Sequence, residues 1–151
     1  MNTDIENLEA MAAIGERIGT LLKGGEVIEL IGDVGAGKTT LTKAIAAGMR
    51  VNGDVSSPSY TLSQVYESRG GIKLRHYDFY RLNDPGILAA ELNEAMLDEK
   101  SVIVIEWGGI VAGILPPDHL QIHILATGET DRQLSFKSGG EKSQRLVEQL
   151  R

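Results

Sequence analysis

The segment 26–39 reads Glu26-Val27-Ile28-Glu29-Leu30-Ile31-Gly32-Asp33-Val34-Gly35-Ala36-Gly37-Lys38-Thr39. Its first half is a short apolar run, interrupted by Glu29, which is typical of a β-strand. Its second half is a glycine-rich loop, after which Leu41, Ile45 and Met49 recur at helical spacing. The sequence therefore predicts a strand, a loop and a helix in direct succession, which is the context that a phosphate-binding loop requires.

The loop itself has the spacing Gly-x-x-x-x-Gly-Lys-Thr, from Gly32 to Thr39. Glycines allow successive backbone N–H groups to curl around an anion, and the N-terminal end of the following helix adds positive potential. We expect Lys38 to contact the outer phosphates of a nucleoside triphosphate and Thr39 to offer its hydroxyl to Mg²⁺. A glycine-rich turn without a ligand is the alternative, but the spacing and both flanking elements favour nucleotide binding. The candidate nucleotide contacts are Asp33, Val34, Gly35, Ala36, Gly37, Lys38, Thr39 and Thr40.

An acidic residue follows the most apolar segment of the chain. Val102 to Ile105 carries only aliphatic side chains and ends at Glu106, as expected for a central strand covered on both faces. A phosphate-binding loop needs an acidic group at the end of a neighbouring strand to hold the metal, directly or through water. Glu106 is therefore the candidate metal ligand beside Thr39. The alternative is an exposed carboxylate that merely ends a strand.

A second carboxylate lies in the segment His76-Tyr77-Asp78-Phe79-Tyr80-Arg81. In a strand, positions 76, 78 and 80 share one face, whereas Tyr77 and Phe79 share the other. Asp78 could orient the attacking water, accept its proton or join the outer shell of the metal. A half-exposed strand carboxylate without a chemical role is an equally weighted alternative. We take Asp78 and Lys38 as the candidate catalytic residues.

The remaining patterns predict an α/β fold. We expect residues 1–151 to form one three-layer domain, in which a mixed, mainly parallel sheet is flanked by helices. The expected elements are a helix to Leu22 begun by a capping box of Thr3 and Glu6, strands at 60–67 and 73–80 that form a hairpin, a short helix after Asp84-Pro85, strands at 120–124 and 134–136, and a final helix at 141–150.

Composition and charge narrow the class of protein. The 151 residues carry a formal net charge of -6, and the lysines and arginines are scattered, which argues against strong, direct binding to nucleic acid. The chain has no cysteine, so thiolate catalysis and cysteine-ligated zinc are excluded. The longest apolar run is too short to cross a membrane and the first residues lack the pattern of a secretory signal, so a cytoplasmic location without membrane contact is expected.

Two histidines and one tryptophan lie outside these motifs. His119 and His123 share one face of a predicted strand, but they would lie roughly 13 Å apart, too far to chelate one zinc ion. Packed or solvated histidines are therefore favoured. Trp107, directly after Glu106, is a candidate to stack on the nucleotide base, and core packing is the alternative.

Taken together, the motifs resemble those of the TsaE (YjeE) ATPases, which take part in bacterial tRNA threonylcarbamoyladenosine modification. The resemblance covers nearly the whole chain, and the ordered set is much more specific than the loop, which any P-loop protein shares. In three places the chain departs from the family pattern: Ser59 replaces a usual Thr, Phe79 replaces a usual Leu, and the residues after Asp84-Pro85 differ. The matching segments are Gly32 to Thr40, Ser57-Pro58-Ser59-Tyr60-Thr61-Leu62, His76 to Leu82, Asp84-Pro85, Ile105-Glu106-Trp107 and Ile114-Leu115-Pro116.

The resemblance implies an ATPase that uses ATP and Mg²⁺. By this resemblance Thr39 and Glu106 hold the metal, Asp78 is the catalytic or water-orienting carboxylate, and Ser57 to Thr61 is a switch segment. Arg132 matches an arginine of the family and is a candidate nucleotide contact. The implied partners are TsaD and TsaB, which transfer threonylcarbamoyl to adenosine 37 of tRNAs that read A-starting codons. ATP hydrolysis would reset that complex, and tRNA would be contacted indirectly, through the partners.

Two other classes of protein use the same loop. A small-molecule kinase needs an acceptor pocket and usually a mobile, arginine-rich lid, and the sequence between Leu82 and Ser101 has no such composition. A regulatory GTPase is the second alternative, because Glu106-Trp107-Gly108-Gly109 loosely resembles an acid-x-x-Gly switch. The chain lacks the Asn-Lys-x-Asp guanine signature, so ATP is preferred over GTP.

Overall fold

The computed structural model describes residues 1–55, 63–80, 84 and 86–151. The expected switch segment, Ser57 to Thr61, lies outside the described residues. The helices and strands are β1 (Asn2–Ile5), α1 (Leu8–Leu21), β2 (Val27–Ile31), α2 (Lys38–Met49), β3 (Ser63–Glu67), β4 (Lys73–Asp78), α3 (Gly86–Leu97), β5 (Ser101–Glu106), the 3₁₀ helix η1 (Gly108–Ile114), β6 (Leu120–Ala126), β7 (Arg132–Ser138) and α4 (Glu141–Leu150).

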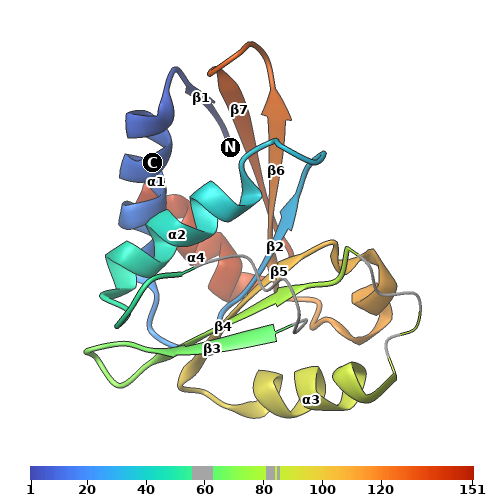
Figure 1. Ribbon diagram of the computed structural model, residues 1–151. Coiled ribbons are helices and arrows are strands. Elements are labelled where there is room, and N and C mark those ends of the chain that lie inside the picture. The colour runs from blue at the N-terminus through green and yellow to red at the C-terminus, as the bar shows by residue number, and fades with distance from the viewer. Residues whose placement is uncertain (56–62, 81–83, 85) are drawn as a thin grey trace.

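Within these ranges seven strands form one sheet, in the order β1-β7-β6-β2-β5-β4-β3 (Figure 1). The four central strands, β6, β2, β5 and β4, pair in parallel, and the outer strands β7, β1 and β3 are joined by antiparallel pairing. β2, which leads into the glycine-rich loop, therefore lies between β5 and β6. Because parallel strands end at the same edge of a sheet, the loop meets the ends of β5 and β4 there.

Helices cover both faces of the sheet, which confirms the predicted three-layer α/β architecture. α1, α2 and α4 gather on one face, and α3 lies on the other with η1 (Figure 1). The core beneath α1 and α2 contains Ile18, Leu41 and Ile45, all completely buried. The core beneath α3 contains Tyr77, Leu92 and Ile105. Every residue of β5 is buried, as its aliphatic sequence predicted.

The N-terminal prediction is wrong in one respect. Thr3 and Glu6 do not cap a helix; Thr3 lies in β1, which pairs antiparallel with β7. The first helix begins at Leu8, and the Asn7 side chain caps it by accepting a hydrogen bond of 2.8 Å from the Ala10 N–H. Pairing with β7 provides partners for backbone groups of residues 2–5 and allows Ile5 to be buried. The sequence near Thr3 contains no sign of that distant partner.

The other predicted elements are confirmed. β3 and β4 form the antiparallel hairpin, although residues 60–62 of the first predicted strand lie outside the described residues and β4 ends at Asp78 instead of Tyr80. α3 follows Asp84, and β6 and β7 contain the two alternating segments near the C-terminus. The last helix has the expected bounds, Glu141–Leu150. None of the helices in the described part of the chain is long and apolar enough to span a membrane.

Candidate functional site

The glycine-rich loop joins the buried strand β2 to the start of α2. Gly35 has φ +81° and Gly37 has φ +114°, a backbone region in which a side chain would be strained. These two glycines let the chain turn sharply and place Lys38 in the first turn of α2. Gly37 is the N-cap residue and supplies no side-chain cap. The first N–H groups of α2 therefore point out of the helix without a capping side chain, as an anion-binding helix end requires.

A cavity of about 330 Å³ opens beside the loop. Three segments that are distant in sequence line it: the loop with the first turn of α2, the end of β4, and the end of β5. Its lining residues are Val34, Gly35, Gly37, Lys38, Thr39, Thr40, Asp78, Tyr80, Glu106 and Trp107. The structure thus brings most of the sequence-predicted site residues to one cavity.

Lys38 lies at the centre of this arrangement. Its ammonium donates hydrogen bonds to the carbonyl oxygens of Gly32, at 2.5 Å, and Asp33, at 3.0 Å. It also lies 4.2 Å from the centroid of the Trp107 ring, within the range of a cation–π contact. Burial lowers the pKa of Lys38, and the carboxylates of Glu106, Asp78 and Asp33 act in the opposite direction. The loop therefore holds a partly desolvated cation close to several carboxylates.

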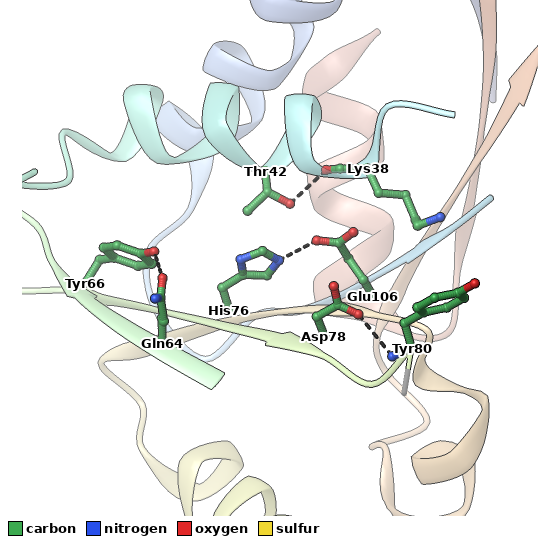
Figure 2. Close-up of polar contacts among 8 residues, drawn as sticks. All are labelled: Lys38, Thr42, Gln64, Tyr66, His76, Asp78, Tyr80 and Glu106. Carbon is green, nitrogen blue, oxygen red and sulfur yellow. Dashed lines mark hydrogen bonds and ion pairs between the residues drawn. The ribbon is translucent and has the colours of Figure 1, made fainter. Parts of the chain in front are cut away.

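The two predicted carboxylates are neighbours across the sheet. Asp78 and Glu106 are directly paired in the parallel register of β4 and β5, and Figure 2 shows both side chains below the first turn of α2. Asp78 accepts a hydrogen bond of 3.0 Å from the Tyr80 N–H, which restrains its carboxylate. Glu106 is only 3% exposed, so the alternative of an exposed strand end does not describe it.

His76, for which no chemical role was predicted, contacts Glu106. Its Nε2 lies 2.5 Å from Glu106 Oε2, and the histidine is completely buried (Figure 2). The strand alternation that placed positions 76, 78 and 80 on one face was the available signal. That signal did not show which strand would lie beside His76.

The side chains present are suited to Mg²⁺. Thr39 and Glu106 line the same cavity and offer a hydroxyl and a carboxylate, which are the hard oxygen donors that Mg²⁺ prefers. The described residues contain no group of three His, Cys, Asp or Glu that could enclose a metal by itself. Such an enclosure is not needed, because Mg²⁺ at nucleotide sites is held by one or two protein oxygens together with phosphates and water.

Trp107 has backbone torsions in the left-handed region, with φ 59°. Its ring makes two contacts, one with the Lys38 ammonium and one with the Tyr80 ring, whose centroid lies 4.8 Å away. A bulky residue with positive φ is strained, and such strain occurs often at functional sites. The structure places Trp107 in the lining of the cavity near Lys38.

Arg132 lies on the other side of the loop. Its Nε donates a hydrogen bond of 2.8 Å to the Ala36 carbonyl, and its Nη1 donates to carbonyls of the β6–β7 turn, including Asp131 at 2.8 Å. The hydrogen bond from Arg132 therefore restrains the backbone of the loop at the buried Ala36. Arg132 also borders a second cavity of about 190 Å³, which the loop separates from the first and which Ile5, Asn7, Leu8, Met11 and Glu129 help to line.

The two histidines of the C-terminal half have separate surroundings. His119 Nδ1 donates to the Pro116 carbonyl at 2.7 Å, and its Nε2 lies 3.3 Å from Glu29 Oε1. Glu29, the polar interruption in β2, also accepts a hydrogen bond of 3.0 Å from the Gln121 amide. His123 is exposed on β6. His119 is thus a packed histidine with a polar neighbour, as favoured from the sequence.

The fold and the loop together define an α/β protein in which a strand, a glycine-rich loop and a helix follow one another as in phosphate-binding loops. A family model described as "Threonylcarbamoyl adenosine biosynthesis protein TsaE" matches residues 5–134. The chain belongs to this family.

Individual relatives agree with the family match. The tRNA threonylcarbamoyladenosine biosynthesis protein TsaE of Bacillus subtilis (strain 168) is 35% identical over 148 residues, which cover 95% of this chain and 89% of the relative. The protein of the same name from Mycobacterium leprae (strain TN) is 41% identical over 126 residues, covering 79% of this chain and 78% of the relative. Among solved structures, the crystal structure of Bacillus subtilus YdiB matches with a TM-score of 0.80 and 29% identity, covering 99% of this chain and 93% of YdiB.

Proposed function

We propose that this chain is an ATPase subunit that binds ATP with Mg²⁺, hydrolyses it, and supports threonylcarbamoyladenosine modification at position 37 of tRNAs that read A-starting codons, together with TsaD and TsaB. The observation that carries the proposal is the convergence of Lys38, Thr39, Asp78 and Glu106 on one cavity at the start of α2. Membership of the TsaE family supports the link to tRNA modification. Cytoplasmic location follows as part of the same proposal.

Phosphate binding is assigned to the loop and to Lys38. The Lys38 ammonium is hydrogen-bonded to the carbonyls of Gly32 and Asp33. A phosphate in the cavity offers a charged acceptor, which makes a stronger hydrogen bond than a neutral carbonyl does. The N–H groups of the loop and of the first turn of α2 would complete the cradle. Lys38 therefore turns from the loop carbonyls to the outer phosphates on binding.

The metal is assigned to Thr39 and Glu106, and the attacking water to Asp78. Mg²⁺, when bound, supplies positive charge that offsets the charge of the phosphates. Asp78 lies beside Glu106 at the same edge of the sheet and lines the same cavity. Its carboxylate, restrained by the Tyr80 N–H, would orient the water for attack on the terminal phosphate.

The nucleotide base is assigned to the second cavity. This cavity meets the loop at Gly35, Gly37 and Thr40 and lies near the β6–β7 turn, away from β4 and β5, whose ends carry the carboxylates. Apolar side chains of Ile5, Leu8 and Met11 would contact the faces of a ring, and Asn7 offers a polar edge. Most small-molecule sites combine apolar walls with a few polar groups in this way. Trp107, predicted from the sequence as a candidate to stack on the base, lies instead in the first cavity beside Lys38, so we expect it to contact the phosphate side of the nucleotide.

The experiment that tests nucleotide binding is a titration of the purified chain with ATP, ADP and GTP, in Mg²⁺ and in EDTA, followed by Trp107 fluorescence and by calorimetry. Trp107 is the single tryptophan of the chain and lies in the cavity wall, so its emission should change on binding. We expect ATP to bind more tightly than GTP. Equal or tighter GTP binding would favour the regulatory GTPase. Absence of heat with every nucleotide in millimolar Mg²⁺ would contradict the proposal.

The assignment of Asp78 is tested by Asp78→Asn. This change keeps the size of the side chain and removes its charge, so nucleotide affinity should stay within about threefold while hydrolysis falls about 10²-fold or more, the usual contribution of a positioned base. Release of inorganic phosphate is measured with the chain alone and with TsaD and TsaB homologues present. If nucleotide affinity fell as much as hydrolysis does, Asp78 would instead be a residue that binds the ligand. Phosphate transfer to a small acceptor rather than to water would favour the kinase alternative.

A further inference from the structure

His76 and Glu106 form a buried pair between two strands. His76 lies two residues before Asp78 on β4, and Glu106 is the last residue of the neighbouring parallel strand β5. The imidazole Nε2 lies 2.5 Å from Glu106 Oε2. The histidine is 0% exposed and the glutamate 3% exposed. Solvent therefore does little to orient either side chain, and their positions depend on each other.

The pair leaves the histidine outside the cavity and the glutamate inside it. Glu106 lines the cavity beside Lys38 and Thr39, whereas His76 lies deeper, below Thr42 of α2 (Figure 2). The imidazole thus contacts one carboxylate oxygen from the side that faces away from the cavity. His76 is not placed to bind a ligand in the cavity itself. Its contact with Glu106 restrains the position of the Glu106 carboxylate in the cavity wall.

A buried carboxylate needs such a partner. Its charge loses the solvation of water, and the loss must be offset by hydrogen bonds and nearby positive charge. A glutamate side chain also has three rotatable bonds, and fixing them costs conformational entropy on every binding event unless the protein has already done so. Residues behind metal ligands commonly provide this orientation.

We propose that His76 is a positioning residue, which holds Glu106 Oε2 so that the remaining oxygen, Oε1, is directed toward the divalent cation of the bound nucleotide. The inference rests on the proposed function, because it concerns the same cation. It adds a residue whose contribution to metal binding passes entirely through Glu106.

The test compares three variants of position 76 by their affinity for Mn²⁺, used in place of Mg²⁺ because it can be followed by electron paramagnetic resonance. His76→Gln keeps an N–H donor at a similar reach, His76→Asn keeps the polarity but is too short to reach Glu106, and His76→Leu removes the donor. Mn²⁺ binding is measured in the presence of saturating ADP, and ADP binding is measured separately in EDTA. Thermal unfolding of each variant reports whether it folds.

We expect His76→Leu and His76→Asn to weaken Mn²⁺ binding about 10- to 100-fold, the range typical for residues behind metal ligands. His76→Gln should retain most of the affinity, and ADP binding in EDTA should change little in all three. If His76→Leu does not fold, the Gln and Asn pair decides the outcome. Folded variants with unchanged Mn²⁺ affinity, or equal losses in Gln and Asn, would overturn the proposal.

A second arm repeats the substitutions in a Glu106→Gln background. If His76 acts through Glu106, its replacement should cause no further loss of Mn²⁺ affinity there. A loss of the same size in both backgrounds would overturn the proposal. The wild-type protein distinguishes a failure of the proposed metal binding from a failure of the role of His76. If it binds ADP equally well with and without the metal, the metal part of the proposed function fails. If ADP binding by the wild-type protein depends on the metal, and the His76 variants have the same Mn²⁺ affinity as the wild-type protein, only the role of His76 fails.

Discussion

Lys38 carries its charge in a largely buried position, and this should make the proposed nucleotide binding sensitive to pH. Burial lowers the pKa of the free ammonium, although three carboxylates oppose the effect. A bound phosphate would add negative charge next to the ammonium and so raise its pKa. The complex then keeps the proton at pH values at which the free protein has begun to lose it.

The pKa of Lys38 sets the direction in which nucleotide affinity should change with pH. Nucleotide affinity should be level at pH values below the lowered pKa of free Lys38 and should fall as pH rises through that pKa, toward the ordinary lysine value of about 10.4. Calorimetric titration with ADP at a series of alkaline pH values measures this. Lys38→Arg is the control, because arginine stays charged throughout the range; its affinity is expected to be weaker but level. A parallel fall in the Arg variant would assign the effect to another group.

The crossing of α1 and α2 brings their backbones unusually close. A Cβ on Gly19 would lie 2.1 Å from the Ile45 carbonyl oxygen, and one on Gly48 would lie 2.1 Å from the Glu16 carbonyl oxygen. Both obstacles are backbone atoms, which cannot turn aside as a flexible side chain can. The small residues therefore set the distance between the helix that carries Lys38 and the helix that covers it.

Gly19→Ala should separate the two helices and destabilise the protein by roughly 1–3 kcal/mol, as overpacking usually does, despite the higher helix propensity of alanine. The free energy of unfolding is obtained from urea denaturation followed by circular dichroism. Gly113→Ala is the matched control, since a Cβ there would meet nothing within 4 Å, and it should change stability by less than about 0.5 kcal/mol. Equal effects of the two changes would mean that the close approach has no energetic importance.

The net charge of -6 bears on how the chain could serve a tRNA-modifying function. Binding to nucleic acid depends on clustered lysines and arginines that displace counterions from phosphates. The proposal that the partners TsaD and TsaB carry most contacts to tRNA agrees with this charge. Under this proposal the nucleotide site does not have to contact the tRNA directly.

The chain alone should accordingly show little affinity for tRNA at physiological salt, with a Kd above about 10⁻⁵ M, weaker than a basic nucleic-acid-binding protein. Fluorescence anisotropy of labelled tRNA measures this, first with the chain alone and then with TsaD and TsaB homologues added. Submicromolar binding by the chain alone, weakened steeply by salt, would show a direct RNA surface that its composition does not predict.

Much of the fold and part of the candidate site could be predicted because their signals are local. The aliphatic run before Glu106 predicted a central strand, the alternation from position 120 onward predicted β6 and β7, and the glycine spacing of the loop predicted a strand and a helix on either side. Periodicity reports which side of an element is buried. It does not report which other element covers that side.

The chemistry proposed for the loop and most of the succession of strands and helices could be predicted from residues within a few positions of each other, although β1 was missed. Three contacts could be seen only in the folded chain: β1 pairs with β7, Arg132 donates a hydrogen bond to the Ala36 carbonyl of the loop, and His76 lies against Glu106, thirty positions away. These contacts depend on strand order and on the packing of helices across the sheet. They join residues whose separation along the chain carries no sign of their distance in space.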